Sequence, residues 1–353
     1  MSLPSRVPSS GLTVREAPPS EYAAIEEFVR GQTAHPLWYD AAWQAPLAAY
    51  GLTFRMYAAW QGGEVRGVLP LVIQRSLFFG RRAVSVPWAD AAGLLSADQE
   101  AANALLQSGV GLLKEWRLQR LLLRQPSPLW DWPVDRSDKL AMQLRLTADP
   151  ETLWKSFDPK VRNQVRKSEK SGVVTETLTS DEGLDGFFEV YSRNMRDLGS
   201  PGHSRRYFAA LLGAFSRQTE VHVARCDGQV VGAGLTMLNG SRLEIPWASS
   251  LQEYNRHCVN HSLYWHILSR ACRAGQEWFY FGRSTRGSGP HHFKKQWGAE
   301  EVPLYWYSLD AEGRPQVSGQ APRDSFGMAV RIWKQLPLGL TRVLGPLLIS
   351  QLD

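Results

Sequence analysis

The predicted elements in the second half of the chain repeat the order of those in the first half. Two strand-like runs joined by a short polar turn occur at residues 54–71 and again at 220–237. Each turn contains glycine, which is typical of a hairpin. A third run with the tripeptide PWA follows each hairpin, at 84–93 and at 243–252. The repeat therefore indicates two structural units of one kind.

A helical segment and another strand complete each predicted unit. Apolar residues recur at spacings of three and four over 99–116 and 260–275, which is the period of a helix. Strand-like runs follow at 120–124 and 278–283. The tryptophan of PWA precedes the last arginine of that run by the same number of residues in both halves. We therefore expect an α/β (α+β) fold of two tandem units, each with a mixed central sheet flanked by helices.

The chain of 353 residues is long for a single core, so two domains are expected. The stretch QPSPLWDWP at 125–133 is a turn-rich break between the halves. We place an N-terminal domain at 1–135, a C-terminal domain at 136–312 and an amphipathic tail at 313–353. The second domain is expected to begin with a strand at 141–147 and helices near 150–171, 184–195 and 205–216.

The cysteines and the apolar runs restrict the class of protein. Cys226, Cys258 and Cys272 show no CxxC spacing, so neither a zinc site nor a disulfide framework is indicated. The N-terminal sequence lacks the apolar run of a secretory signal, and no run of about 18 apolar residues occurs that could span a bilayer. We expect a cytoplasmic protein with reduced thiols and no metal site.

Two interpretations of the apolar tail are open. Two prolines break the stretch 333–352 into pieces too short to cross a membrane. The tail either docks on the folded domains or rests on the inner membrane surface. In the second case Arg331, Lys334 and Arg342 would face lipid phosphates.

Long stretches of the chain resemble a known family. These are VRNQVRKSEKSGV at 161–173, YSRNMRDLGSPGHSRRYFAALL at 191–212, FGRSTRGSGPHHFKKQWGAEEVPLYW at 281–306 and WKQLPLGLTRVLGPLLISQL at 333–352. They are similar to FemAB-like proteins encoded with exosortase (PEP-CTERM) and exopolysaccharide systems. The resemblance implies two tandem GNAT-like domains, the second of the acetyltransferase-6 type. It also implies transfer of acyl or aminoacyl groups to cell-envelope precursors such as those of peptidoglycan.

The acyl donor is open between aminoacyl-tRNA and acyl-CoA. GNAT enzymes hold the coenzyme A pyrophosphate on a glycine-rich turn, but the corresponding turn at 250–260 contains no glycine. Such a turn offers few free backbone N–H groups to a pyrophosphate. The long charged helical hairpin of some FemA-type enzymes is also missing, so no large tRNA-contacting surface is indicated. No further cofactor is expected.

The basic stretch 281–298 is the predicted catalytic region. The resemblance implies that Lys294, in the string FKKQWG, stabilises negative charge on the reacting group. Arg283 follows a predicted strand, and His292, or its neighbour His291, is a candidate proton carrier. Two further cations in the stretch, Arg286 and Lys295, are predicted to bind the anionic part of a substrate. The alternative interpretation is a basic loop that only links two strands.

Other candidate substrate-binding residues lie outside this stretch. They are Arg162, Arg166, Tyr191, Asn194, Trp247, Tyr254 and Asn255. The two arginines stand one helical turn apart and could clamp a diphosphate, or they could belong to the solvated face of a surface helix. The strand and turn residues would line the acyl pocket and the donor turn of the GNAT fold, although a tryptophan is often part of a core.

These features predict direct acyl or aminoacyl transfer to an amine without a covalent enzyme intermediate. The acceptor would be a phosphate-bearing amino sugar, a peptide or a lipid-linked precursor. The formal net charge of +6 permits an anionic ligand but does not require one. An acyl-CoA-dependent N-acyltransferase, a non-catalytic carbohydrate- or lipid-binding protein and an RNA-binding module are the alternatives. No DNA partner is expected.

Overall fold

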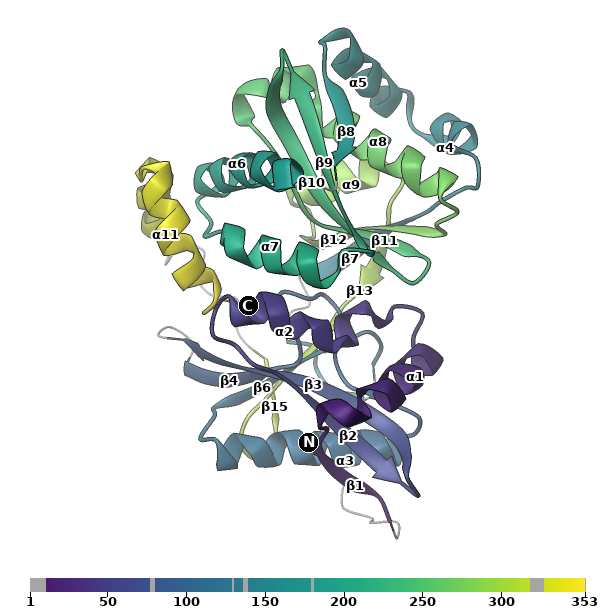
Figure 1. Cartoon of the computed structure of the whole chain (residues 1–353), viewed down its shortest axis with the longest axis vertical. Coiled ribbons are helices and arrows are strands. Elements are labelled where there is room, and N and C mark those ends of the chain that lie inside the picture. The colour runs from purple at the N-terminus through teal and green to yellow at the C-terminus, as the bar shows by residue number, and fades with distance from the viewer. Residues whose placement is uncertain are drawn as a thin grey trace. The chain divides into compact units, whose positions relative to one another are not determined.

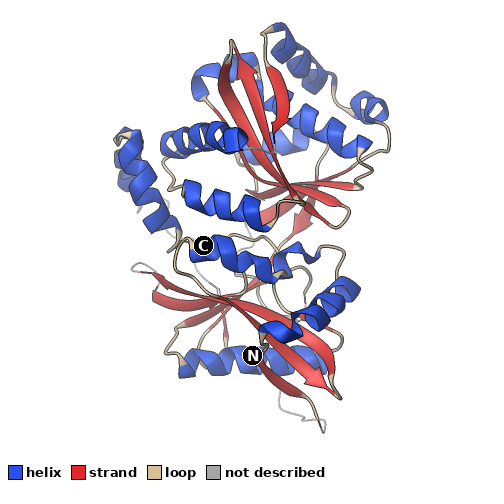
Figure 2. Ribbon diagram, in the orientation of Figure 1, coloured by secondary structure: helices blue, strands red, loops and turns tan. Residues whose placement is uncertain are grey.

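The chain folds into two units, each with a mixed sheet flanked by helices (Figures 1 and 2). The first unit is formed within residues 1–139, 303–321 and 350–353, and the second within 140–302 and 322–349. The computed structural model describes residues 11–76, 80–128, 130–135, 139–178, 181–317 and 327–352. The predicted start of the second domain, at residue 136, lies outside these residues.

The first unit has a sheet with the strand order β1-β2-β3-β4-β6-β14-β15, and β5 pairs with β3. Its strands are β1 (Thr13–Glu16), β2 (Phe54–Gln61), β3 (Glu64–Ser76), β4 (Gly80–Val84), β5 (Leu95–Ser96), β6 (Arg120–Gln125), β14 (Tyr305–Leu309) and β15 (Pro315–Gln316). Its helices are α1 (Tyr22–Gln32), α2 (Gln44–Ala48) and α3 (Gln99–Glu115). Helix α3 supplies a continuous apolar face, including Leu105 and Leu113, to the main core of the unit.

Residues 305–309 form a strand of the first sheet, although the division made from the sequence assigned them to the second domain. Strand β14 pairs with β6 over Leu309↔Leu121 to Tyr305↔Gln125. The apolar side of this strand places Tyr307 and Leu309 in the first core. The chain therefore returns to the first unit after β13, before it adds α10 and α11 to the second. A break in composition cannot reveal such a return, because it depends on long-range strand pairing.

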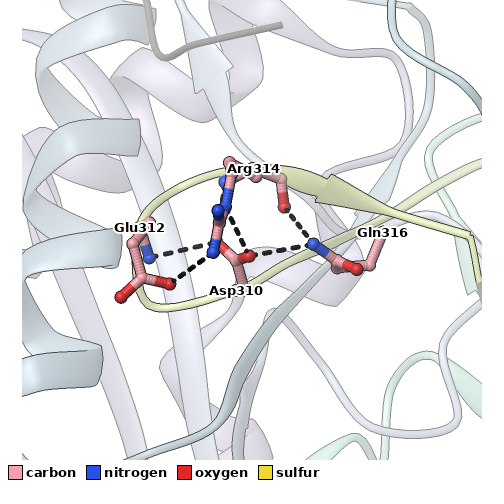
Figure 3. A network of polar contacts seen from close by, with 4 residues as sticks. All are labelled: Asp310, Glu312, Arg314 and Gln316. Carbon is pink, nitrogen blue, oxygen red and sulfur yellow. Dashed lines mark hydrogen bonds and ion pairs between the residues drawn. The ribbon is translucent and has the colours of Figure 1, made fainter.

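The turn between β14 and β15 is built around Asp310 (Figure 3). Its carboxylate accepts hydrogen bonds from the N–H groups of Glu312 and Arg314, the guanidinium of Arg314 and the side-chain amide of Gln316. Burial alone would raise the pKa of Asp310, but the bonds from Arg314 and Glu312 hold it below its ordinary value. The carboxylate therefore stabilises the turn in its ionised form.

Replacing Asp310 with alanine is expected to lower the free energy of unfolding by about 1–3 kcal/mol, because several donors lose one acceptor. Since the pKa of Asp310 is lowered by folding, this stabilisation is present above the ordinary carboxyl pKa and is lost as the pH falls through the folded-state value. Chemical denaturation at neutral and acidic pH measures both effects. Glu312→Ala, which removes only an exposed ion pair, should change stability by less than about 0.5 kcal/mol.

The second unit has a sheet with the strand order β13-β7-β12-β11-β10-β9-β8. Its strands are β7 (Lys139–Arg145), β8 (Val174–Leu178), β9 (Thr219–Cys226), β10 (Gln229–Asn239), β11 (Arg242–Ser250), β12 (Trp278–Thr285) and β13 (Glu300–Pro303). Its helices are α4 (Pro150–Ser156), α5 (Pro159–Lys170), α6 (Asp181–Leu198), α7 (Arg205–Ala214), α8 (Val259–Arg273), α9 (Gly289–Gln296), α10 (Gly327–Gln335) and α11 (Leu338–Ile349).

Helices α4, α5 and α8 cover one face of the second sheet, and α6 with α7 cover the other (Figure 1). Helix α8 carries Leu263, Ile267 and Leu268 into a core that it shares with β12 and α5. Glycines in β10 make this packing possible, since a Cβ at Gly232 would lie 2.4 Å from Val259. The helix is thereby held directly against the middle of the sheet.

Two helices, α10 and α11, form in the described part of the tail. Helices α10 and α11 both pack against α6. The guanidinium of Arg342 donates to Ser192 at 3.0 Å and pairs with Glu189. A Cβ at Gly345 would lie 3.0 Å from the carbonyl oxygen of Gly202, so the helix backbone rests on the loop after α6. One side of these helices therefore docks on a folded domain, which is the first of the two interpretations. Within the described part of the chain, no helix has both the length and the apolar character needed to cross a membrane.

Candidate functional site

Strands β11 and β12 separate in the middle of the second sheet. They pair in parallel from Arg242↔Trp278 to Glu244↔Tyr280, and both continue beyond these pairs, β11 to Ser250 and β12 to Thr285. Next to the branch point, the buried carboxylate of Glu244 accepts from Asn239 and Arg242. Beyond these pairs the two strands diverge in a V.

A bulge on the other edge of β11 contributes to this divergence. The pairing with β10 changes from Leu235↔Trp247 to Met237↔Glu244, so β11 carries one extra residue between these pairs. Pro246 lies in that interval, where its missing N–H costs no regular ladder bond. The bulge bends β11 at the point where it leaves β12.

The first unit has the same branch, but its own side chains occupy it. Strands β4 and β6 pair in parallel only from Arg82↔Arg120 to Val84↔Leu122. Beyond them Arg124 is fully buried, and its guanidinium donates to the carbonyls of Val86 and Ala89. The strand predicted at 84–93 is not formed. Strand β4 ends at Val84, and the chain after it folds over Arg124. This branch is closed by the unit's own residues.

The first turn of α8 stands after the branched strand β11, as in the expected donor-binding arrangement. Residues Gln252–His257 form a 3-10 helix, and Cys258 then adopts a left-handed conformation with φ 55°. Glycine would suit that conformation, but the turn forms without it. Asn255, on this 3-10 helix, is exposed, and the Tyr254 hydroxyl donates to Gln229. The side chain of Cys258 makes no capping bond to α8.

The predicted basic loop contains a helix. Ser288 caps α9 by accepting from the N–H of His291, and Pro290 stands in the first turn. The helix points Lys294 back toward β12, where its ammonium donates to the carbonyls of Gly282 at 3.0 Å and Arg283 at 2.9 Å. Lys294 is buried, while the Arg283 side chain is partly exposed. The stretch therefore links β12 to β13 through a helix rather than a loop, with Trp297 in the core and Phe293 packed against it.

The carboxylate of Glu301, on β13, contacts three other basic side chains of this stretch. Its carboxylate pairs with Arg286 at 2.7 Å, with His291 at 2.9 Å and with Lys295 at 3.4 Å. The hydrogen bond from His291 is the main reason that the pKa of Glu301 lies below its usual range. The other ring nitrogen of His291 accepts from the N–H of Gly287. Arg286 and Lys295 are therefore paired within the chain, whereas the predicted proton carrier His292 is exposed.

His261, in the first turn of α8, faces α9 and was not predicted from the sequence. Its ring stacks on Trp297 at 5.8 Å and meets Phe293 edge-on at 5.3 Å. Burial, and then the positive charge of Lys160, lower the pKa of His261 to about 4, so the imidazole is neutral near pH 7. Its buried Nε2 has no hydrogen-bond partner in the described structure, and neither has Nε1 of Trp297. Buried polar atoms without a partner are uncommon and need an explanation.

Arg162 and Arg166 stand on α5, whose apolar face buries Val161 and Val165. The guanidinium of Arg166 lies 5.6 Å from the ring centroid of Trp154 and contacts Asn163. Nε of Arg162 is buried without a partner in the described structure. The two arginines therefore stand one turn apart on a helix, as predicted, but have different surroundings.

Tyr191, Asn194 and Trp247 lie on the α6–α7 face of the sheet. The Tyr191 hydroxyl accepts from the N–H of His203, and its ring is part of a buried aromatic cluster. The cavity beside it measures only about 10 Å³, which leaves space for one water at most. Trp247 packs on Phe208 at 5.2 Å. Asn194 differs, because its amide donates to Ser249 on the diverging part of β11.

The structure thus places Lys294 against Gly282 and Arg283 of β12, and the newly identified His261 against Phe293 and Trp297. It places Tyr191 and Trp247 in aromatic packing on the opposite face, together with Asn194. A group of three or more His, Cys, Asp or Glu side chains suited to a metal ion does not occur among the described residues. Cys226 and Cys272 also lack the features of a nucleophile, since burial raises the pKa of both thiols.

Comparison with known proteins agrees with this architecture. Residues 155–295 match the family model described as an acetyltransferase (GNAT) domain, which covers β9 to β12 with the branch and α8. No curated protein sequence matches the chain. The second unit is therefore assigned to the GNAT fold by sequence as well as by structure.

Solved structures extend the similarity to both units. FemX aligns with a TM-score of 0.65 at 16% identity, over 84% of this chain and 96% of its own. A tandem GNAT protein from the clavulanic acid biosynthesis pathway aligns with a TM-score of 0.52 at 14% identity, over 85% and 98%. L-PGS from Bacillus licheniformis aligns with a TM-score of 0.51 at 12% identity, over 97% and 99%. The predicted tandem GNAT-like α/β fold is confirmed.

Proposed function

We propose that this chain transfers an acyl or aminoacyl group directly to an amine of a cell-envelope precursor. The observation that carries the proposal is the divergence of the parallel strands β11 and β12, which precedes the first turn of α8 and lies within the segment that matches a GNAT domain. The similar folds of FemX and L-PGS support an acyl or aminoacyl transferase. The first unit, whose branch is closed by Arg124, would hold no second donor site.

Transfer to an amine needs a proton acceptor and a group that stabilises the oxyanion of the tetrahedral intermediate. We assign the second role to the ammonium of Lys294, together with the Arg283 side chain. His261 is the favoured proton acceptor because its imidazole is neutral and its Nε2 is unpaired. His292 is the second candidate for that role. The amine nitrogen bonds to the carbonyl carbon, the donor's thiol or ribose hydroxyl leaves, and no acyl-enzyme forms.

The donor would lie along β11 with its leaving group near Tyr254 and Asn255. Acyl-CoA and aminoacyl-tRNA both fit the proposal, and no other cofactor would be required. The acceptor would be a phosphate-bearing amino sugar, peptide or lipid-linked precursor of peptidoglycan or exopolysaccharide. The candidate contacts to its anionic part are Arg162, Arg286 and Lys295. The acceptor would displace Glu301 from Arg286 and Lys295. The chain would then act in the cytoplasm, in a pathway of the exosortase-associated kind.

A thermal-shift titration tests the proposal. Acetyl-CoA, long-chain acyl-CoA, charged and uncharged tRNA, and UDP-linked amino sugars would be added separately to the full chain. Stabilisation follows RT ln(1 + [L]/Kd), so a ligand at one hundred times its Kd adds about 2.7 kcal/mol. We expect one donor and one acceptor class to raise the Tm. Stabilisation by sugars alone, with every donor inactive, would point instead to a carbohydrate-binding protein.

A further inference from the structure

The side of α10 and α11 that faces away from α6 is an exposed apolar surface. It comprises Met328, Ile332, Leu340, Val343 and Leu347, whose exposed fractions range from 42% to 75%. Large apolar side chains with comparable exposure elsewhere in the described residues are Val174, Leu198 and Val317. Exposed apolar groups are thus concentrated on these two helices, and we call this set the outer face.

The spacing along α11 makes the outer face a regular stripe. Leu340, Val343 and Leu347 stand at intervals of three and four residues and therefore share one side of the helix. Thr341 and Gly345 are buried on the side that meets α6 and the following loop. A helix that is apolar on both sides is normally covered on both sides. The α6 contact covers only one.

The charges around the outer face have a single sign. Residues 327–349 contain no Asp or Glu. Arg331 and Lys334 on α10 are exposed, and Arg342 on α11 is paired with Glu189 of α6. Against a second copy of this chain, such a surface would place cations near cations. Anionic lipid phosphates complement both the charge and the apolar side chains.

We propose that α10 and α11 dock the chain on an anionic phospholipid surface through the outer face. The apolar side chains of the outer face would enter the boundary between headgroups and acyl chains, while Arg331 and Lys334 pair with lipid phosphates. The inner sides of both helices keep their packing on α6, so docking requires no unfolding. This inference concerns a surface other than the transfer site and does not depend on the proposed activity.

Co-sedimentation of the full chain with vesicles tests the proposal. The vesicles would be phosphatidylcholine alone and phosphatidylcholine with phosphatidylglycerol. The chain should bind the second kind and bind the first much more weakly. Arg331→Gln/Lys334→Gln should weaken that binding about 30-fold, which corresponds to about 1 kcal/mol for each cation. Binding that is equal for both vesicle kinds would overturn the role of the charges and with it the proposal.

Val343→Glu is the matched test of the apolar part. Val343 is exposed to 64%, and Val174, in β8, to 66%, so Val174→Glu makes the same chemical change at equal exposure elsewhere. Binding to the anionic vesicles should fall at least 10-fold in Val343→Glu and be unchanged in Val174→Glu. Circular dichroism and Tm would show that both variants fold. If the chain dimerises through this face, with Val343→Glu giving a monomer and no variant affecting vesicle binding, the lipid proposal is wrong.

Discussion

Replacing Lys294 with methionine is expected to reduce kcat by about 100-fold or more, the range observed when one oxyanion-stabilising donor is removed. The variant keeps the aliphatic stem that α9 buries but loses the ammonium that contacts the end of β12. It should also be less stable by about 1–3 kcal/mol, because two carbonyl acceptors lose their donor. Turnover and chemical denaturation measure the two effects separately.

Lys155→Met is the matched control for this substitution. Lys155 lies in the last turn of α4 in the same unit and is exposed. Its replacement should leave kcat unchanged and alter stability by less than about 0.5 kcal/mol. A folded Lys294→Met protein with nearly normal turnover would remove Lys294 from the mechanism. It would then have only the structural role of fixing Gly282 and Arg283.

Replacing His261 with phenylalanine is expected to have opposite effects on stability and activity. The stacking on Trp297 can persist, and an unpaired buried nitrogen is eliminated, so the variant should be about 1 kcal/mol more stable at neutral pH. Loss of the proton acceptor should lower kcat about 100-fold, within the usual contribution of general-base catalysis. A core histidine without a functional role would give the gain in stability without the loss of activity.

The pH dependence of stability provides a second measurement on His261. Its pKa is lowered from an ordinary value near 6.5 to about 4, so the unfolded chain binds the proton more tightly. The stability is therefore full above about pH 6.5 and falls as the pH decreases toward 4. Between about pH 7 and pH 5 this group should cost the native protein up to about 2 kcal/mol.

His261→Phe should abolish that part of the acid destabilisation. Two other buried histidines, His203 and His222, have pKa values lowered to about 3, mainly by burial, and their contribution remains in both proteins. Denaturation curves at the two pH values, compared between native chain and variant, isolate the difference. Equal pH slopes in the two proteins would show that His261 is not buried in the neutral state.

The two hairpins could be predicted because their signals are local. The turns at Gln61–Glu64 and Cys226–Gln229 lie between β2 and β3 and between β9 and β10, as the glycines and the alternation indicate. The tripeptide PWA was less reliable. At 246–248 it lies in the extended strand β11, but at 87–89 it lies in an irregular loop where Trp88 has φ 65°. The conformation at 87–89 depends on tertiary contacts with Arg124, which a local sequence pattern does not predict.

The site was predicted in part for a related reason. Lys294 and Arg283 lie together as expected, because β12 and α9 are neighbours in sequence. The capping signal of α9 was present as Ser288, Gly289 and Pro290, but the glycines in the stretch favoured a loop interpretation. Glu301 neutralises several of the cations through a strand partner outside the motif. His261 could have been suggested by its place in the first turn of the helix after β11, but its isolation from hydrogen-bond partners depends on packing.

The measurement that tests the central claim most directly is amide formation followed by mass spectrometry in single-turnover reactions. Native chain, Lys294→Met and Lys155→Met would each receive an acyl-CoA or aminoacyl-tRNA donor with an amino-sugar acceptor. We predict an amide product with native chain and Lys155→Met, strongly reduced product with Lys294→Met, and no acyl adduct on the intact protein at any time. An adduct that forms and decays as product rises would contradict direct transfer, and a complete absence of product with every donor would contradict the proposed activity.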